Sequence, residues 1–336
     1  MDGLPHSIPL HVSPTIQRTL KAPIGCVGVG LHTGRRVRLD LLPAPAGSGI
    51  TFRRTDMGID IPARHDHVID TRLCTVLGLP GRPEARVGTV EHVMAALAGA
   101  GVHNAIVAVD GPEVPIHDGS AASALFLLDC AGLELQPEFA PAIEVLRPVR
   151  VAQGEAFAEL RPLPFAFDMA VSIAFEAAAI GRQALTLRLT PESFRTELAR
   201  ARTFTLASEV EQLRASGLAL GGSLDNAVVV DGARVLNPGG LRMPDEFVRH
   251  KLLDAVGDLA LAGGPLRARF VGHRTGHALN NRLLRALFAD RAAWRESATD
   301  LPGRIVPAAE SDSEVGLALP RRKLPSAAAR LPATAA

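Results

Sequence analysis

The sequence predicts an α+β fold arranged in two domains. Strand-like segments gather in groups and helix-like segments in pairs, which favours α+β over a doubly wound parallel sheet. The length of 336 residues corresponds to about two domains of ~150 residues. A proline-rich break from Gln136 to Pro148 separates two halves with a similar order of elements. We therefore expect a loose leader over 1–16, domains over 17–138 and 139–302, and a disordered tail over 303–336.

The first half of the chain combines strand and helix patterns. Apolar and polar residues alternate as in a half-buried strand, and a Pro/Ala/Gly turn separates this segment from a second strand. Two apolar runs that close at a glycine predict short helices, and an apolar run between them predicts a buried strand. The expected elements of this half are strands at 37–41, 50–54 and 104–110 and helices at 89–99 and 120–132.

The second half repeats strands and helices in a similar order. Its clearest element is the helix over 244–262, because Pro244 and Asp245 open it and Gly263 and Gly264 close it. The other expected elements are strands around 143–175, at 184–189 and at 227–231, and helices at 191–200, 207–216 and 278–292.

The composition is that of a globular protein of nearly neutral charge. Hydrophobic residues make up 47% and charged residues 21%, which excludes disorder of the whole chain. Lysine and arginine number 36 and aspartate and glutamate 35, so the basic excess of a nucleic-acid binder is absent. No apolar run approaches the ~20 residues of a membrane helix, and the N-terminus lacks the pattern of a secretory signal. Cys26, Cys74 and Cys130 form an odd set without CxxC spacing, so we expect a reducing compartment, the cytoplasm.

One face of the helix over 244–262 carries three residues that suit metal chemistry. At ~100° per residue, His250, Asp254 and Asp258 fall within a stripe about 80° wide. His250 and Asp254 are spaced i, i+4 and can reach one metal ion, whereas Asp258 lies about 12 Å from His250 along the axis and is too far. A solvated polar face with a capped histidine is the alternative explanation. Lys251 is one of three lysines in the chain, which points either to a need for an ammonium group or to chance.

Another histidine stands at the start of the helix over 89–99. Thr89 can cap this helix and Glu91 suits the positive end of its dipole, which is sufficient to explain both residues. His92 can instead be a third metal ligand, with Glu91 beside it as a general base. Two histidines and one carboxylate with an open fourth position form a common catalytic zinc site. No HExxH motif occurs, so the helix of the usual zinc peptidases is excluded.

Two further segments combine histidine and glycine. His277 follows Gly276 just before the helix over 278–292, where it can either transfer protons or simply begin the helix; a carboxylate such as Asp258 can hold its ring and raise its pKa. Segment 28–34 has GxGxxxG spacing with no long helix after it, so a tight turn between strands fits better than a dinucleotide site. Motifs of phosphate loops and serine hydrolases are absent.

Taken together, these segments resemble the family of UDP-3-O-acyl-N-acetylglucosamine deacetylases, zinc enzymes of lipid A biosynthesis in Gram-negative bacteria. The resemblance extends over roughly residues 17–300 and follows the family's order. It implies two similar two-layer domains, each a small sheet packed on helices, with the active site between them. The segments that carry it are QRTLKAPIGCVGVGLHTG (17–34), FRRTD (52–56), DTRLCT (70–75), TVEH (89–92), PEVPIHDGSAA (112–122), RARTF (200–204), GLALGGSLDNAVV (217–229), DEFVRHKLLDAVGDL (245–259) and GHALNN (276–281).

The resemblance also implies a metal and a reaction. It makes His92, His250 and Asp254 the ligands of a catalytic Zn²⁺, with Fe²⁺ as the alternative metal in the cell, and Glu91 the general base. The implied reaction is hydrolysis of the acetamide of UDP-3-O-(3-hydroxyacyl)-N-acetylglucosamine, which releases acetate and UDP-3-O-acyl-glucosamine and is the committed step of the pathway. We expect arginines to meet the diphosphate, and a monomer with no nucleic-acid partner.

Other positions match residues that handle the substrate. His277 matches a general acid or electrostatic clamp, and Asp258 the carboxylate that orients it. Lys251 and Thr203 match groups that steady the substrate and the oxyanion. The residues expected near the substrate are Phe204, Leu206 and Cys74; Cys74 is expected to be a bystander thiol, because hydrolysis by zinc and water needs no nucleophilic cysteine.

Several positions depart from the family's pattern. Segment 175–180 lacks an expected His-Pro pair, and Leu206 replaces an expected aromatic residue. Both lie toward the expected acyl-chain groove, formed by apolar residues of 204–220 such as Phe204, Leu206, Leu213, Leu218 and Leu220, so they bear on chain-length preference. The alternative for these leucines is an ordinary core. His117 is also unusual, and we assign it no role.

Two other functions remain open at this point. The first is a dehydratase of acyl thioesters, since a histidine and a carboxylate in an apolar channel serve that chemistry without zinc. The second is a nucleotide-sugar or lipid-binding module without catalysis, which would tolerate replacement of Glu91.

Overall fold

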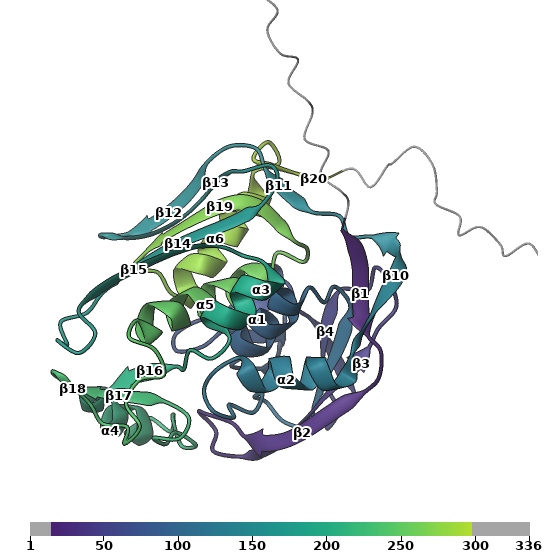
Figure 1. Cartoon of the computed structure of the whole chain (residues 1–336). Helices are drawn as coiled ribbons and strands as arrows, with labels where there is room; N and C mark the ends of the chain where they lie inside the picture. Colours follow the sequence, from purple (N-terminus) through teal and green to yellow (C-terminus); the bar gives the residue numbers. More distant parts are fainter. Residues whose placement is uncertain (1–14, 298–336) are drawn as a thin grey trace, which may run out of the picture. The chain divides into compact units, whose positions relative to one another are not determined.

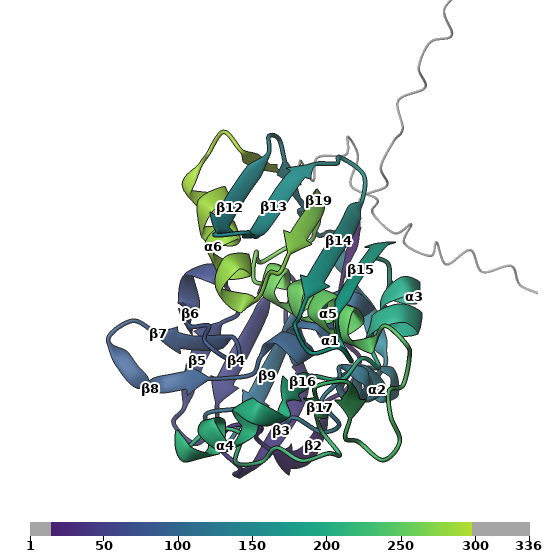
Figure 2. The ribbon, with the colours of Figure 1, turned by 90° about the vertical axis from the view of Figure 1, so that its left-hand side faces the viewer.

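The computed structural model describes residues 15–297, which have an α+β architecture. Helices α1 (Glu91–Ala100) and α5 (Glu246–Ala260) lie side by side at the centre (Figure 1). A seven-stranded sheet covers α5 and a five-stranded sheet lies on the side of α1, as the turned view shows (Figure 2). The predicted α+β class is confirmed.

The five-stranded sheet belongs to the first half of the chain. Its order is β2-β3-β9-β4-β5, with only β4 and β9 parallel. In β3, Val37, Leu39 and Leu41 face the core while their neighbours are more exposed, because side chains alternate between the two faces of a strand. The elements are β2 (Ile24–Val29), β3 (Arg36–Pro43), β4 (Ile50–Arg54), β5 (Ile59–Pro62), β9 (Ala105–Val109) and α2 (Ala122–Ala131).

The seven-stranded sheet belongs to the second half. Its main path is β12-β13-β19-β11-β20, and β14 joins β19 in parallel while pairing with β15 on its other edge. Helices α5 and α6 pack against it. The elements are β11 (Ile143–Val145), β12 (Val149–Gln153), β13 (Ala156–Pro162), β14 (Phe167–Ala174), β15 (Arg182–Arg188), β19 (Leu266–His273), α6 (His277–Ala289) and β20 (Trp294–Glu296).

Three small sheets and several short elements complete the described residues. One sheet pairs β1 (Ile16–Leu20) with β10 (Leu133–Phe139), and the others have the orders β6-β7-β8 and β16-β17-β18. Their elements are β6 (Val68–Asp70), β7 (Val76–Leu79), β8 (Arg82–Val87), β16 (Phe204–Leu206), β17 (Val228–Asp231) and β18 (Arg234–Val235). The remaining short elements are η1 (His65–His67), α3 (Pro191–Ser193), η2 (Phe194–Leu198) and α4 (Ala207–Ala215).

Most predicted elements are confirmed, with two corrections. The single helix predicted over 191–200 is a three-residue α segment followed by a π-helical turn that ends at Leu198. Thr89 does not cap α1: its backbone is left-handed, with φ of 59°, and its hydroxyl donates to Glu113 Oε1 at 2.9 Å. The domain division at residue 138 stays a prediction. The leader up to residue 14 and the tail over 303–336 lie outside the described residues.

A glycine sets the approach of the two central helices. A Cβ atom added to Gly257 on α5 would lie 1.9 Å from the backbone carbonyl oxygen of Glu91, the first residue of α1. Only glycine fits at such a backbone-to-backbone contact. The contact places the start of α1 against the middle of α5, where the predicted metal ligands of both helices meet.

Candidate active site

Two predicted metal ligands lie one turn apart on α5. Nε2 of His250 is 3.2 Å from Oδ1 of Asp254. The ring of His250 is fixed from behind, because its Nδ1 is 3.0 Å from the carbonyl oxygen of Ala201 and donates to it. In a neutral ring this bond places the proton on Nδ1 and leaves Nε2 free, which is the form of histidine that binds a metal.

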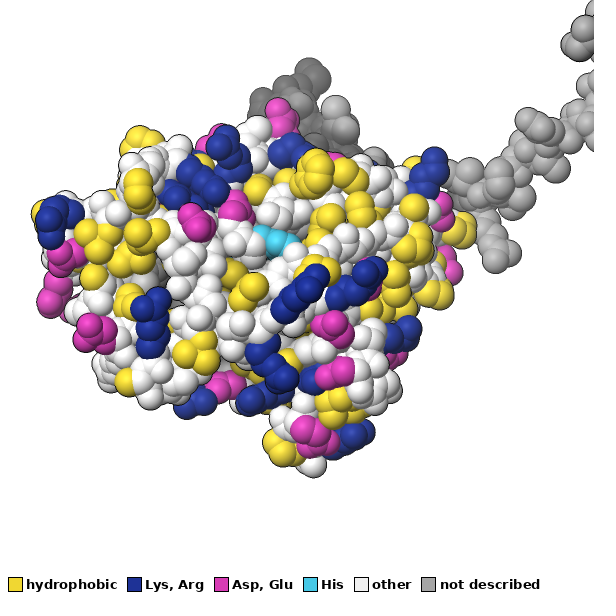
Figure 3. Space-filling view, turned by 90° about the horizontal axis from the view of Figure 1, so that it is seen from below, with side chains coloured by type: hydrophobic (Ala, Val, Ile, Leu, Met, Phe, Trp, Pro, Cys, Tyr) yellow, Lys and Arg dark blue, Asp and Glu magenta, His cyan; other side chains and the backbone are white. Residues whose placement is uncertain are grey.

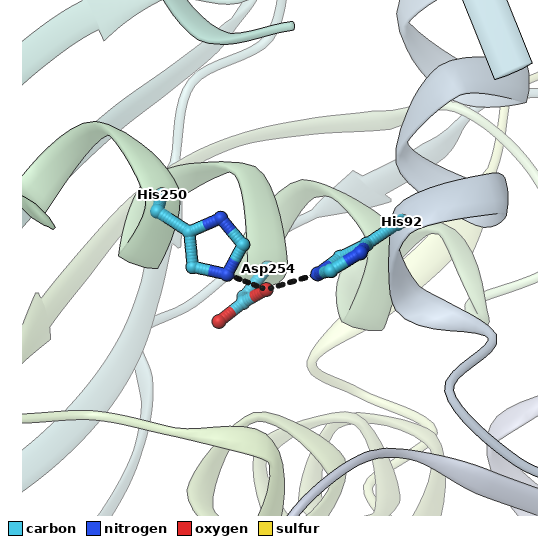
Figure 4. A group of neighbouring side chains, drawn as sticks. All are labelled: His92, His250 and Asp254. Atoms are coloured by element: carbon cyan, nitrogen blue, oxygen red, sulfur yellow. Dashed lines mark ion pairs between the residues drawn. The ribbon is translucent and has the colours of Figure 1, made fainter. Parts of the chain in front are cut away.

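The third predicted ligand reaches the same point from α1. Nε2 of His92 is 3.5 Å from Oδ1 of Asp254, and the two imidazole rings meet edge to face (Figure 4). Burial lowers the pKa of His92, so its imidazole is neutral and able to coordinate a metal. The prediction that these three side chains converge, although they come from two helices, is confirmed.

The cluster has the chemistry of a metal site. A tetrahedral ion bound at ~2.0–2.2 Å has ligand atoms about 3.4 Å apart, close to the 3.2 and 3.5 Å measured here. Oδ1 of Asp254 is buried and has no hydrogen-bond partner within residues 15–297. A buried carboxylate oxygen is normally satisfied, so a cation between the three residues explains the arrangement. The cluster can therefore hold a metal ion.

Lys251 holds the other oxygen of the ligand carboxylate. Its Nζ donates to Oδ2 of Asp254 at 2.8 Å. Burial acts to lower the pKa of Lys251, but the carboxylate of Asp254 outweighs it and raises that pKa. For Asp254, burial acts to raise the pKa, and His250 with Lys251 holds it well below the usual range. Lys251 therefore keeps Asp254 ionised and directs Oδ1 toward the histidines.

Glu91 stands beside the cluster in the first turn of α1. Its Oε2 accepts a hydrogen bond from the backbone N–H of Thr75 at 3.0 Å, and its Oε1 lies 3.9 Å from Nε2 of His277. Burial, with the nearby carboxylates of Asp254 and Asp258, raises the pKa of Glu91 to about 7 although His277 opposes this. A carboxylate with one fixed oxygen and a pKa near neutrality suits a general base.

His277 and Asp258 form a hydrogen-bonded pair on the opposite side of Glu91. His277 is the first residue of α6, and its Nδ1 lies 2.9 Å from Oδ2 of Asp258. Burial acts to lower the pKa of His277, but the carboxylates of Asp258 and Glu91 raise it to about 10. The imidazole is therefore protonated at neutral pH, with Nε2–H directed toward Glu91.

Comparison with known proteins points to the same family that the sequence segments resemble. The family described as UDP-3-O-acyl N-acetylglycosamine deacetylase matches residues 17–289. The chain is 50% identical to a UDP-3-O-acyl-N-acetylglucosamine deacetylase of Acidithiobacillus ferrooxidans, over 83% of this chain and 91% of that protein.

The chain belongs to this deacetylase family. A further relative of the same name, from Anaeromyxobacter dehalogenans, is 49% identical over 83% of this chain and 89% of its own length. Another, from Idiomarina loihiensis, is 48% identical over 83% and 91%. Within residues 15–297, none of the helices is long and apolar enough to cross a lipid bilayer.

An aromatic cluster adjoins the group of His92, His250 and Asp254 in this family member. Phe204 meets Phe247 and Phe175 edge to face, with ring centres 5.0 and 5.5 Å apart. Its ring also lies 6.3 Å from that of His250 and 5.6 Å from Nζ of Lys251. Phe204, which is expected near the substrate, therefore lies close to His250 and Lys251. Its role toward substrate stays a prediction.

Apolar side chains in the segment after Phe204 are partly exposed to solvent. Leu206 ends β16 half-buried, and α4 has no buried residue. Leu220 is 54% exposed. Phe204 and Leu206 pack against the hydrophobic core, whereas Leu220 lies outside it, so the core explanation holds in part and the acyl-chain groove stays a prediction. Seen from the side of β2, apolar and basic side chains share this face of the molecule (Figure 3).

Other predicted positions have different surroundings. Thr203 donates its backbone N–H to the carbonyl of Gly119, and its hydroxyl makes no hydrogen bond within the described part of the chain. Cys74 lines a pocket of about 330 Å³ that Thr89 and Leu218 also line. Burial, with Glu91 nearby, raises the pKa of Cys74 to about 12. Its thiol therefore stays protonated at neutral pH, as expected of a bystander.

Two polar residues of the site were not predicted. Thr75 uses both its groups there: its N–H binds Glu91, and its hydroxyl donates to Oδ1 of Asp258 at 2.6 Å. Asn280 donates to Oδ2 of Asp258 at 2.8 Å. Both stand within segments of family resemblance, 70–75 and 276–281, and that is the only signal the sequence offers for them. His117, which was given no role, lies 3.4 Å from the thiol of Cys26.

Proposed function

We propose that the chain hydrolyses the acetamide of UDP-3-O-(3-hydroxyacyl)-N-acetylglucosamine, releasing acetate and UDP-3-O-acyl-glucosamine. The observation that carries the proposal is the cluster of His92, His250 and Asp254 with the buried pair of Glu91 and His277 beside it. The names of the relatives support the substrate class. The relatives supply the name of the substrate, and the buried cluster supplies a chemical reason for hydrolysis.

The metal we propose is Zn²⁺, with Fe²⁺ as the alternative in the cell. Two imidazoles and one carboxylate are a common zinc ligand set, and imidazole nitrogen also suits iron. When bound, such a metal acts as a Lewis acid that acidifies water and polarises a carbonyl oxygen. His92, His250 and Asp254 would hold it, and Lys251 keeps the carboxylate ionised.

Glu91 acts as the general base in this proposal. Its Oε2 is occupied by the N–H of Thr75, so Oε1 is the oxygen that accepts the proton of the attacking water. A pKa raised to about 7 makes the carboxylate basic enough to take this proton at neutral pH.

His277 supplies a positive charge beside Glu91. Its Nε2–H faces the space beside Glu91, and Asp258 stabilises the imidazolium through Nδ1. In this position it can stabilise the oxyanion that forms on the acetamide, or give its proton to the leaving sugar amine. Lys251 and Thr203 are proposed to steady the substrate and the oxyanion from the side of α5 and β16.

The acyl chain is proposed to lie against the apolar surface of residues 204–220. Phe204 lies between this surface and His250, and the leucines beyond Phe204 are partly or fully exposed to solvent. Leu206 and segment 175–180 lie on this side, so we propose that they set the preferred chain length. Surface arginines are proposed to meet the diphosphate.

The other two functions fit less well. A thioester dehydratase needs no metal, which leaves the convergence of three ligands unexplained. A binding module needs no buried carboxylate of raised pKa beside them. The three free cysteines support the proposed cytoplasmic location. The monomeric state stays a prediction.

Metal content and acetate release, measured on the same samples, test the proposal. The wild-type protein should bind one tight metal ion and release acetate from the acylated UDP-sugar. His92→Ala and Asp254→Ala should lose both properties, because each removes a ligand. Glu91→Gln should keep the metal and lose turnover by about 10²–10⁴-fold. Full activity of the metal-free protein, or loss of metal in Glu91→Gln, would contradict the assigned roles.

A further inference from the structure

A second large pocket lies away from the metal cluster. It has a volume of about 600 Å³ and is lined by residues toward the C-terminal ends of α1 and α5. Ala98, on its wall, is about 9 Å along α1 from the metal ligand His92. None of the proposed ligands or catalytic residues lines it. The pocket is therefore separate from the active site, although the same two helices carry both.

The pocket offers an apolar wall of the size that small ligands require. Met94 and Leu97 on α1 and Val256 and Leu259 on α5 contribute to it, and all four side chains are buried. Ligand pockets of ~300–1,000 Å³ with mostly apolar linings are typical small-molecule sites. A ligand that fills this pocket must therefore have a large apolar part.

The charged residues that line the pocket within the described part of the chain are all basic. Its lining within residues 15–297 includes three arginines and no aspartate or glutamate. Arg267 is paired with Glu144 at 2.9 Å, and Arg64 approaches the exposed Asp66 at 3.4 Å. Arg18, on β1, is half-buried. Within residues 15–297 no carboxylate forms an ion pair with Arg18, and a guanidinium in this position next to an apolar wall favours an anionic group on the ligand.

A histidine beside Arg18 adds a neutral donor. The backbone N–H of Arg18 donates to Nδ1 of His103 at 3.1 Å. Nδ1 therefore carries no proton, and Nε2–H is the donor of this neutral ring. Arg18 and His103 both line the pocket, so two donors stand on one side of it.

We propose that this pocket binds an amphiphilic anion, a carboxylate carried by an alkyl chain. The alkyl chain lies between α1 and α5 against Met94, Leu97, Val256 and Leu259. The carboxylate accepts hydrogen bonds from Arg18 and His103. The proposal does not depend on the deacetylase reaction, because no residue of that reaction lines the pocket.

Calorimetric titration of the full, metal-loaded chain with dodecanoate tests the proposal. Ala98→Phe puts a ring into the pocket and should abolish binding at this site. Arg18→Gln should weaken it by about tenfold or more, the effect of losing one charged hydrogen bond. Arg36→Gln is the matched control, since Arg36 is an exposed arginine that does not line the pocket. Dodecanol and dodecyltrimethylammonium, which keep the chain without the negative charge, should bind much more weakly.

The variant Phe204→Ala distinguishes binding in this pocket from binding at the apolar surface beside the proposed metal site. Unchanged binding in Ala98→Phe and Arg18→Gln, with loss in Phe204→Ala, would overturn the proposal and assign dodecanoate to the active-site side. Equal binding of the cationic analogue would overturn the role of the arginine. If Ala98→Phe does not fold, as shown by thermal unfolding, Arg18→Gln on the edge of the pocket decides the question.

Discussion

Gly257→Ala tests whether the contact between α1 and α5 holds the metal site together. The added Cβ would lie 1.9 Å from the carbonyl oxygen of Glu91, whereas real Cβ atoms essentially never come under 3.0 Å. The two helices must therefore separate by on the order of 1 Å, because a packed interior has no free space to absorb the methyl group. His92 follows Glu91 directly, so this movement separates it from Asp254.

Two effects of different size follow from this displacement. Overpacking of this kind costs about 1–3 kcal/mol of folding free energy, which lowers the melting temperature by several degrees. A displacement of about 1 Å at reacting groups reduces the rate by about 10²-fold. We therefore expect Gly257→Ala to remain folded at 25 °C, to bind metal more weakly and to lose most of its activity.

The assay combines thermal unfolding, metal titration with a competing chelator and acetate release. Gly239→Ala is the matched control, because Gly239 is exposed and a Cβ there meets nothing within 4 Å. Gly239→Ala should behave as the wild type in all three measurements. If Gly257→Ala also binds metal and turns over as the wild type does, the close helix contact does not determine the site.

Further predictions concern pH, the acyl chain and the metal. Activity should fall as the pH drops through about 7, where Glu91 becomes protonated, and as it rises through about 10, where His277 loses its proton; a bound cation shifts both limits to lower pH. Asp258→Asn should move the upper pH limit of activity to still lower pH, because the imidazolium of His277 loses its carboxylate partner. An unchanged upper pH limit would mean that a group other than His277 sets this limit. UDP-N-acetylglucosamine without the acyl chain should have a much lower kcat/KM than the acylated substrate. Phe204→Ala should reduce that difference in kcat/KM. Equal values of kcat/KM for both substrates in the wild type would contradict binding of the acyl chain at the apolar surface of residues 204–220. Removal of metal by a chelator should abolish activity, and added Zn²⁺ should restore it.

The sequence was most informative about single helices. α5 was predictable because proline and aspartate precede it and two glycines follow it, and its His250 and Asp254 stand on one face by their spacing alone. Asp258 was excluded as a ligand by its distance along the helix, and it binds His277 instead. Such arguments depend only on the geometry of one element.

Most contacts between elements were beyond that reasoning, although the pairing of Asp258 with His277 was among the expectations. Spacing within α5 cannot tell which residue of α1 faces it, so His92 was one of two explanations open from the residues, and the family resemblance decided in its favour. The hydroxyl of Thr89 was expected to cap α1, but Glu113 lies close enough to accept its hydrogen bond, and Thr89 adopts a left-handed backbone instead. Thr75 was missed for the same reason, because its partners lie 16 and 183 residues away along the chain.

The hydrogen bond between Thr75 and Asp258 has a consequence for synthesis of the protein. A ribosome that adds ~5–20 residues per second needs about 10–40 s to make the 183 residues between them. During that time the nascent N-terminal half carries Glu91 and His92 without α5, and the apolar side of α1 that α5 will cover is open to water. Contacts of such long range also slow folding itself. We therefore expect the nascent chain to need protection by a chaperone until α5 leaves the ribosome, and metal to load only after translation has passed Asp258.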